Sequence, residues 1–104
     1  MSQDKVLSLL SIAAKGRNAV SGEYAVESTV KAGKAFLVMI AADVSNNTKK
    51  MFTNMCDFYK VPIVSYGTKV ELGHAIGKEF RASLAVTNEG LAKTIINKLE
   101  THEE

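Results

Sequence analysis

The feature that most constrains the fold is an uninterrupted apolar run over residues 35–42. Its centre, Phe36-Leu37-Val38-Met39-Ile40, shows no alternation of polar and apolar side chains. A continuous run of this kind is typical of a strand that is covered on both faces. It is far shorter than the roughly 18 residues that a membrane span needs, so we expect no membrane partner. The sequence therefore predicts a buried strand with helices on both sides.

Amphipathic stripes alternate with short apolar runs along the rest of the chain. The stripes predict helices near residues 6–14, 22–32, 51–59, 69–76 and 91–99, and the runs predict strands near 19–21, 63–64 and 84–86. Gly33 is expected to end the second helix, and Ser45 to cap the third. We predict one domain over residues 1–104, an α/β fold in which a mixed or mostly parallel sheet of about four strands lies in a three-layer α/β/α sandwich, with an acidic tail from about residue 100.

The charge balance permits an anionic partner without demanding one. The chain has 13 basic and 11 acidic residues, a net charge of +2. Glu100, Glu103 and Glu104 lie in the last five residues, so the first 99 residues carry 13 basic against eight acidic side chains. The single cysteine excludes an internal disulfide, and residues 1–5 show no secretory pattern, which together indicate a cytoplasmic protein.

The residues that catalysis would need are missing from the sequence. His74 and His102 have no cysteine or carboxylate at a metal-ligand spacing, and Cys56 falls on the inward stripe of a predicted helix. Asp43 follows a strand end, but one carboxylate is not an acid–base pair. We expect no enzyme, no metal and no cofactor.

Two helix beginnings suggest a binding surface. Gly22 and Gly67 each precede a predicted helix, where free N–H groups and the helix dipole favour anions. Lys15, Arg17 and Lys69 lie nearby in the sequence. Such a surface could hold a phosphate backbone, with base contacts adding selectivity. The alternative is that both glycines only allow tight turns.

Several motifs, in order and without large gaps, resemble one family. They are Gly22, a helix ending at Gly33, the run Lys34-Ala35-x-Leu37-Val38-x-x-Ala41-x-Asp43-Val44, the pair Val61-Pro62, and Gly67-Thr68-Lys69-x-x-Leu72-Gly73-x-Ala75-x-Gly77. The chain is thereby similar to the L7Ae/L30e ribosomal protein family, whose members bind kink-turn RNA. It looks most like a bacterial type of this family, through Ser21-Gly22-Glu23, Asn47-Thr48-Lys49-Lys50, Gly77-Lys78-Glu79 and Ala85-Val86-Thr87.

The resemblance implies an α/β/α sandwich and a site on structured RNA, with ribosomal RNA as one candidate. Family members grip sharply bent RNA with the start of the second helix and the loop before the fourth, here residues 22–28 and 66–73. We expect a monomer that binds no DNA. The RNA-binding residues that the resemblance and the helix beginnings together indicate are Lys15, Arg17, Gly22, Glu23, Tyr24, Ser28, Asp43, Val44, Gly67, Thr68, Lys69, Leu72 and Gly73.

Half of this expected grip departs from the family pattern. After the glycine, the pattern is typically x-Asn-Glu-x-x-Lys, and the matching positions are Tyr24, Ala25 and Ser28. Tyr24 can stack on a base, Ala25 offers no polar contact, and Glu23 would repel phosphate. The departures leave open an alternative function, a protein–protein interaction module on the same scaffold with little RNA affinity.

Overall fold

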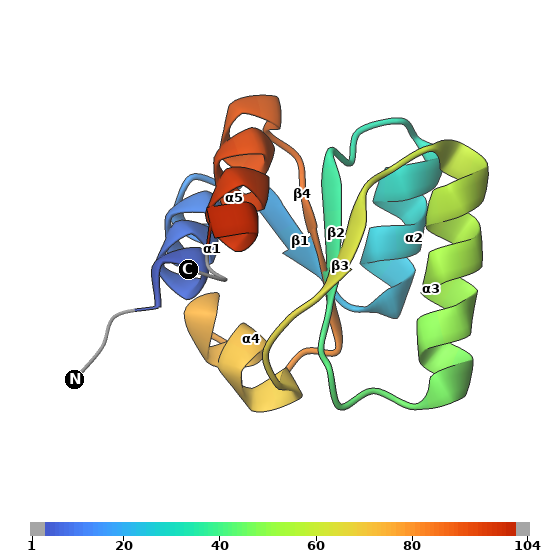
Figure 1. Cartoon of the computed structure of the whole chain (residues 1–104), viewed down its shortest axis with the longest axis horizontal. Coiled ribbons are helices and arrows are strands. Elements are labelled where there is room, and N and C mark those ends of the chain that lie inside the picture. Colours follow the sequence, from blue (N-terminus) through green and yellow to red (C-terminus); the bar gives the residue numbers. More distant parts are fainter. Residues whose placement is uncertain (1–3, 102–104) are drawn as a thin grey trace.

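The computed structural model describes residues 4–101. Helices and strands alternate in it as predicted (Figure 1). In chain order the elements are α1 (Lys5–Lys15), β1 (Ala19–Ser21), α2 (Glu23–Lys31), β2 (Leu37–Ile40), α3 (Asn46–Tyr59), β3 (Ile63–Ser65), α4 (Lys69–Ala75), β4 (Ser83–Val86) and α5 (Glu89–Thr101).

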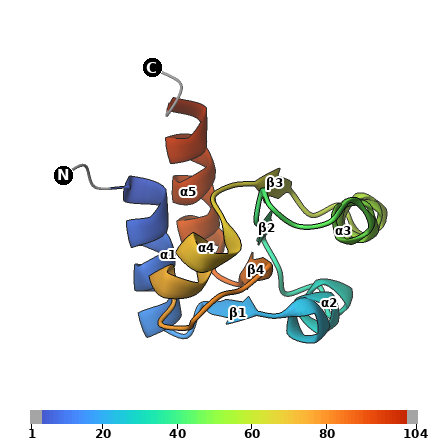
Figure 2. The same ribbon diagram turned by 90° about the horizontal axis from the view of Figure 1, so that it is seen from below.

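The four strands form one mixed sheet in the order β1-β4-β2-β3. β2 and β3 are parallel, with Val38 opposite Ile63. β4 is antiparallel to both of its neighbours, and Ala85 lies between Val38 of β2 and Val20 of β1. β1 and β3 are therefore the two edge strands, and Figure 2 shows them at opposite sides of the sheet.

Helices cover both faces of the sheet. α2 and α3 lie on one face, and α1, α4 and α5 lie on the other (Figures 1 and 2). Side chains of β2 alternate between the layers: Leu37 and Met39 face α1 and α5, whereas Val38 and Ile40 face α2 and α3. The predicted three-layer sandwich and the strand covered on both faces are confirmed.

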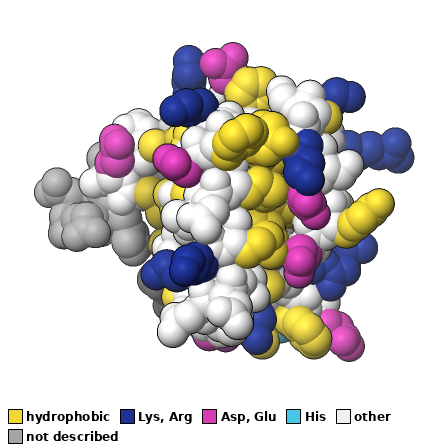
Figure 3. Space-filling view, turned by 90° about the vertical axis from the view of Figure 1, so that its right-hand side faces the viewer, with side chains coloured by type: hydrophobic (Ala, Val, Ile, Leu, Met, Phe, Trp, Pro, Cys, Tyr) yellow, Lys and Arg dark blue, Asp and Glu magenta, His cyan; other side chains and the backbone are white. Residues whose placement is uncertain are grey.

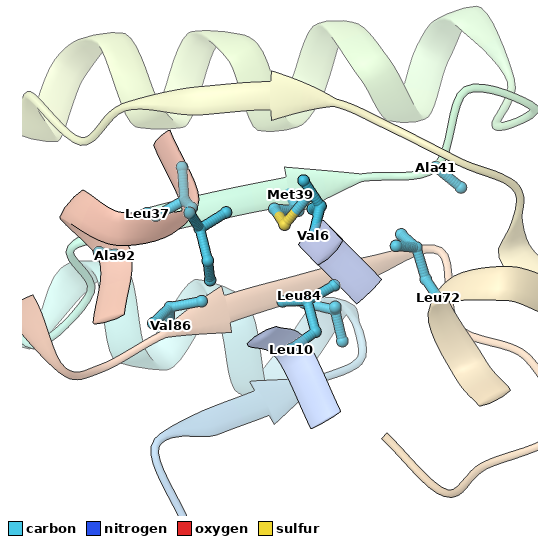
Figure 4. Packing of buried hydrophobic residues seen from close by; sticks show 10 residues of the cluster. Val6, Leu10, Leu37, Met39, Ala41, Leu72, Leu84, Val86 and Ala92 are labelled. Carbon is cyan, nitrogen blue, oxygen red and sulfur yellow. The ribbon is translucent and has the colours of Figure 1, made fainter. Parts of the chain in front are cut away.

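The core consists of two clusters, one on each face of the sheet. Figure 4 shows the first, in which side chains from α1, α4 and α5 meet β2 and β4. Its buried members are Val6, Leu10, Leu37, Met39, Ala41, Leu72, Leu84, Val86, Ala92 and Ile95. The second cluster consists of Val26, Val30, Val38, Ile40, Phe52, Cys56 and Ala85.

Local signals act at the helix ends as the sequence predicts. Ser45 accepts a hydrogen bond from the N–H of Thr48 at 3.2 Å and so caps α3. Gly33 follows α2 with φ of 74°, the left-handed conformation that glycine adopts most easily. Asp4 caps α1 in the same manner, through the N–H of Leu7.

Small differences from the predictions concern element ends. β3 and β4 each extend one residue beyond the predicted strands, and Phe36 precedes β2 as a partly exposed side chain. Tyr59, the last residue of the apolar stripe predicted over 51–59, is 38% exposed rather than buried, and its ring packs edge-on against Phe58. α5 continues to Thr101, so Glu100 is helical; the remaining residues of the predicted acidic tail, 102–104, lie outside the described residues.

Candidate nucleic-acid interface

Arg81, just before β4, links the beginnings of α2 and α4. Its backbone N–H donates to the carbonyl oxygen of Lys69 at 2.9 Å, in the first turn of α4. Its side-chain Nε donates to the hydroxyl of Ser21 at 3.0 Å, next to the start of α2. A third bond, from Nη1 to the carbonyl oxygen of Phe80 at 2.7 Å, fixes the guanidinium orientation. Arg81 therefore holds the two helix beginnings side by side.

The beginning of α2 is open. Gly22 occupies the N-cap position with φ of 97° and has no side chain that could cap the helix. Its own N–H donates to the carbonyl oxygen of Ser83, which anchors the turn to β4. The first-turn N–H groups of residues 23–25 receive no side-chain cap and lie at the positive end of the helix dipole. This end of α2 can accept an anion.

The beginning of α4 is closed by the protein's own side chains. Thr68 and Glu71 form a capping box, with Thr68 N–H to Glu71 Oε1 at 3.0 Å and Glu71 N–H to Thr68 Oγ1 at 3.1 Å. Asp43 Oδ1 accepts from the N–H of Lys69 at 3.0 Å. The expectation of free N–H groups after Gly67 is wrong, because two carboxylates occupy that helix end. Asp43, which follows β2, therefore connects the end of that strand to the beginning of α4.

Two further predicted residues are buried. Leu72 is fully buried in the first core cluster. Gly73 is also buried, and a Cβ atom there would lie 2.3 Å from Cα of Phe80. The glycine thus allows the backbone of the loop over residues 77–82 to approach α4 closely. Neither residue presents a side chain to a ligand; both position the loop that carries Arg81.

The predicted basic residues are spread more widely than the sequence suggests. Lys15 lines a shallow hollow of about 260 Å³ with His74 and Gly77, so it lies beside the end of α4 rather than its beginning. Arg17 is exposed in the turn after α1, with φ of 63°. Lys69 is half-buried at the start of α4. Of the predicted cations, Lys69 is the one that the structure brings to Arg81.

Three of the remaining predicted residues lie on α2, and the fourth, Val44, follows β2. Tyr24 is 86% exposed and lines a small hollow on α2 with Ser28. Glu23 is exposed in the first turn, and Val44 is half-buried against the first core cluster.

Sequence reasoning missed Arg81 and two exposed apolar side chains close to it. Phe80, the preceding residue, is 57% exposed, and Val70, which follows Lys69, is 52% exposed. The signal was present in the segment Lys78-Glu79-Phe80-Arg81, which places two cations and an aromatic ring between Gly77 and a buried strand. We call residues 22–25, Val70, Phe80 and Arg81 together the α2–loop surface.

The side of the molecule on which α2 and α3 lie carries mixed charge. Figure 3 shows apolar side chains in a band down the middle of this side, with basic and acidic side chains interspersed on both sides of the band. Charges of both signs on one face cancel at a distance, so this face does not attract a polyanion as a whole.

The described residues offer little else for chemistry. Burial raises the pKa of the Cys56 thiol to about 11, so the thiol stays protonated and unreactive at neutral pH. Within residues 4–101, histidine, cysteine and carboxylate side chains form no group of three that could hold a metal ion. In the same residues, no helix has the length and apolarity to cross a bilayer.

The described residues thus combine a small sandwich fold with an uncapped helix beginning, an arginine held by hydrogen bonds and exposed apolar side chains. The chain belongs to the Ribosomal protein L7Ae/L30e/S12e/Gadd45 family, whose model matches residues 4–96. This confirms the family that the sequence motifs resemble. The family and its curated relatives are non-enzymatic binding proteins, in agreement with the prediction that the chain is not an enzyme.

Two curated relatives share the name RNA-binding protein YlxQ, the bacterial type that the motifs resemble. The relative from Bacillus subtilis (strain 168) is 40% identical over 92 residues, covering 88% of this chain and 92% of its own. The relative from Enterococcus faecium is 29% identical over 91 residues, covering 88% of this chain and 87% of its own.

Solved structures share the fold. A protein with unknown function from Bacillus halodurans C is 33% identical with a TM-score of 0.91, over 94% of this chain and 99% of its own. The Giardia lamblia 15.5kD RNA binding protein is 24% identical with a TM-score of 0.78, over 97% of this chain and 92% of its own, and at this identity it supports the fold alone.

Proposed function

We propose that this protein is a single-domain, non-catalytic RNA-binding protein that recognises structured RNA of the kink-turn kind at the α2–loop surface. The observation that carries the proposal is the uncapped beginning of α2, held beside the Arg81 guanidinium by the bond to Ser21. Family membership and the RNA-binding names of the curated relatives support the same conclusion.

The phosphate backbone is the first part of the proposed contact. N–H groups in the first turn of α2 point toward an incoming phosphate, and the dipole adds a partial positive charge. Arg81 has five N–H donors and uses two in bonds within the protein, Nε to Ser21 and Nη1 to Phe80, so the others are available to a phosphate oxygen. Lys69 adds a cation nearby.

RNA bases are the second part of the proposed contact. A bent RNA exposes unstacked bases, which aromatic and apolar side chains can cover. Tyr24, Phe80 and Val70 are each more than half exposed and belong to the α2–loop surface. Stacking on the two aromatic rings, Tyr24 and Phe80, is worth about 1–3 kcal/mol per base, enough to favour bent RNA over a straight duplex.

The departures from the family pattern limit selectivity. A good bidentate base contact contributes about 1–3 kcal/mol of discrimination, and Ala25 and Ser28 replace side chains that make such contacts in the pattern. Glu23 suits the helix dipole but repels phosphate. We therefore expect the protein to bind RNA with modest affinity and to prefer bent RNA. We also propose that it acts in the cytoplasm as a ribosome-associated monomer and does not bind DNA.

Binding to a kink-turn stem, compared with the same stem lacking its sheared G·A pairs, tests the proposal. We expect tighter binding to the kink-turn stem and, from about three or four phosphate contacts, a log–log salt slope near −3. Tyr24→Ala should narrow the gap between the stems, because the ring contacts an exposed base. Tyr59→Ala on α3 is the matched control. Equal affinity for both stems, or a slope near zero, would count against the proposal and favour the protein-interaction alternative.

A further inference from the structure

We infer that the free edge of β3 is a docking site for an extended peptide from a partner protein, and that this peptide carries adjacent apolar residues and an acidic residue. β3 ends the strand order β1-β4-β2-β3 and lies on the far side of the sheet from β1, which leads into the α2–loop surface. Figure 2 shows β3 between α3 and α5, with no other element beyond it in the described chain. The inference does not depend on RNA binding.

Backbone groups along this edge are oriented for pairing. The N–H of Val38 donates to the carbonyl oxygen of Pro62, and the N–H of Tyr66 donates to the carbonyl oxygen of Ile40, both at 2.9 Å. Alternate residues of a strand direct their polar groups to opposite sides, so Ile63 and Ser65 direct theirs away from β2. An extended peptide can bond to these groups and become a fifth strand.

Two hollows lie beside the beginning of β3, one toward α3 and one toward α5, and both are lined by Lys60 and Pro62, which precede the strand. The first, about 430 Å³, is lined on the α3 side by Thr53, Cys56 and Asp57. The second, about 320 Å³, is lined on the α5 side by Ala92, Lys93 and Ile96, together with Phe36. Successive side chains of an added strand point to opposite faces, so neighbouring residues of the peptide would enter the two hollows in turn.

Lys60 indicates the charge of the peptide. It is exposed, lines both hollows together with Pro62, and forms no ion pair within the described residues. Lys93 and Glu89 both line the second hollow and pair with each other at 3.7 Å, and Asp57 lines the first hollow, so Lys60 is the basic side chain of the two hollows that has no ion pair with a described residue. An acidic side chain next to Lys60 gains a partner in either hollow. The peptide therefore carries at least one Asp or Glu beside its apolar residues.

The edge of β3 is too short to pair with a long strand of arbitrary sequence. The strand has three residues and Pro62 precedes it, so pairing is restricted to the outward backbone groups of Ile63 and Ser65. Affinity must then come from side chains that fit both hollows, which makes the site selective.

Selection from a displayed library of random peptides of about seven residues tests the inference on the full chain. We expect enriched sequences with adjacent apolar residues and an Asp or Glu. The enriched peptide, synthesised and titrated, should bind Ser65→Pro at least about tenfold more weakly than wild type, because proline removes an outward N–H that β2 does not use. Ser65→Ala keeps that N–H and should bind like wild type.

Two further measurements show whether weaker binding of Ser65→Pro comes from the lost N–H group or from misfolding of the variant. An N-methyl group on the peptide residue opposite Ser65 should weaken binding to wild type, since it removes a backbone donor and leaves every side chain intact. Lys60→Asp should also weaken binding, because it replaces the proposed partner of the acidic peptide residue by a carboxylate; aspartate tolerates the left-handed backbone conformation at this position. Lys50→Asp on α3 should not weaken binding.

Three results would overturn the inference. They are failure of the library to enrich any sequence, equal binding of the enriched peptide to wild type and Ser65→Pro, and concentration-dependent dimerisation of the protein that Ser65→Pro abolishes. The last result would assign the edge to a second copy of the chain.

Discussion

At the scale of single residues, Arg81 does the most to shape the proposed site. It bonds to Lys69 through its backbone and to Ser21 through its side chain, so one residue sets the spacing of two helix beginnings. Its free donors then lie beside the uncapped end of α2. Arginine suits both tasks, because its planar fork can bond to protein and phosphate together.

Replacing Arg81 by alanine should weaken binding of a kink-turn stem by about tenfold or more and reduce the salt slope by about one. Arg81→Lys keeps the charge but loses the Nε–H donor to Ser21, so it should restore the salt slope without restoring full affinity. Fluorescence anisotropy at several salt concentrations measures both effects. Lys93→Ala, on α5, should change neither; an equal loss in that variant would show that only net charge matters.

Gly73 has no Cβ atom, and this allows the backbone of Phe80 to pack directly against α4. A Cβ atom there would lie 2.3–2.8 Å from backbone atoms of Phe80, so Gly73→Ala must push the loop away from α4. We expect a loss of about 1–3 kcal/mol in the free energy of unfolding, measured by urea denaturation. Gly90→Ala places its Cβ 3.4 Å from a side-chain oxygen of Asn88 and should retain or raise stability. A neutral Gly73→Ala would contradict the close approach.

At the scale of elements, the two helix beginnings differ although each follows a glycine. The capping box at Thr68 can be found from sequence, since Thr and Glu lie three residues apart. The bond from Lys69 to Asp43 joins residues 26 positions apart, and the bond from Arg81 to Ser21 joins residues 60 positions apart. Local patterns predict the helices and strands, but these contacts depend on how the elements pack.

Tyr66, which follows β3, ties that strand to the start of α1. Its hydroxyl donates to Asp4 Oδ2 at 2.7 Å, and the other carboxylate oxygen of Asp4 caps the helix. Burial, with a smaller contribution from Asp4, raises the pKa of the Tyr66 phenol from 10.0 to about 12. Folding thus favours the protonated phenol, and its contribution to stability is complete below pH 10 and lost as the pH rises toward 12.

Tyr66→Phe should therefore lower the free energy of unfolding by about 1.5 kcal/mol at neutral pH, the value typical of a hydrogen bond to a charged group. The difference from wild type should shrink as the pH rises above 10. Urea denaturation across this pH range measures it. Tyr59→Phe, whose hydroxyl makes no hydrogen bond to another described residue, is the control, and a pH-independent difference for Tyr66→Phe would contradict the account.

At the scale of the whole molecule, the sheet separates two surfaces. The beginning of α2 follows β1 at one edge of the sheet, where bonds over long sequence distances join it to the loop that carries Arg81, and β3 forms the other edge. The sequence predicts the scaffold between them because the buried strands and their helices each carry a local pattern. It predicts the positions of Gly22 and Tyr24 as well, but not that Arg81 lies beside them. The two proposed sites therefore share no residue.

The most direct test of the central claim is a map of backbone amide chemical shifts as a kink-turn stem is added to the full chain. We expect the largest changes in residues 22–25, at Val70 and in residues 78–81, with small changes in β3 and on the outer face of α3. The largest changes on the outer face of α3 or along β3, with residues 22–25 unaffected, would contradict it.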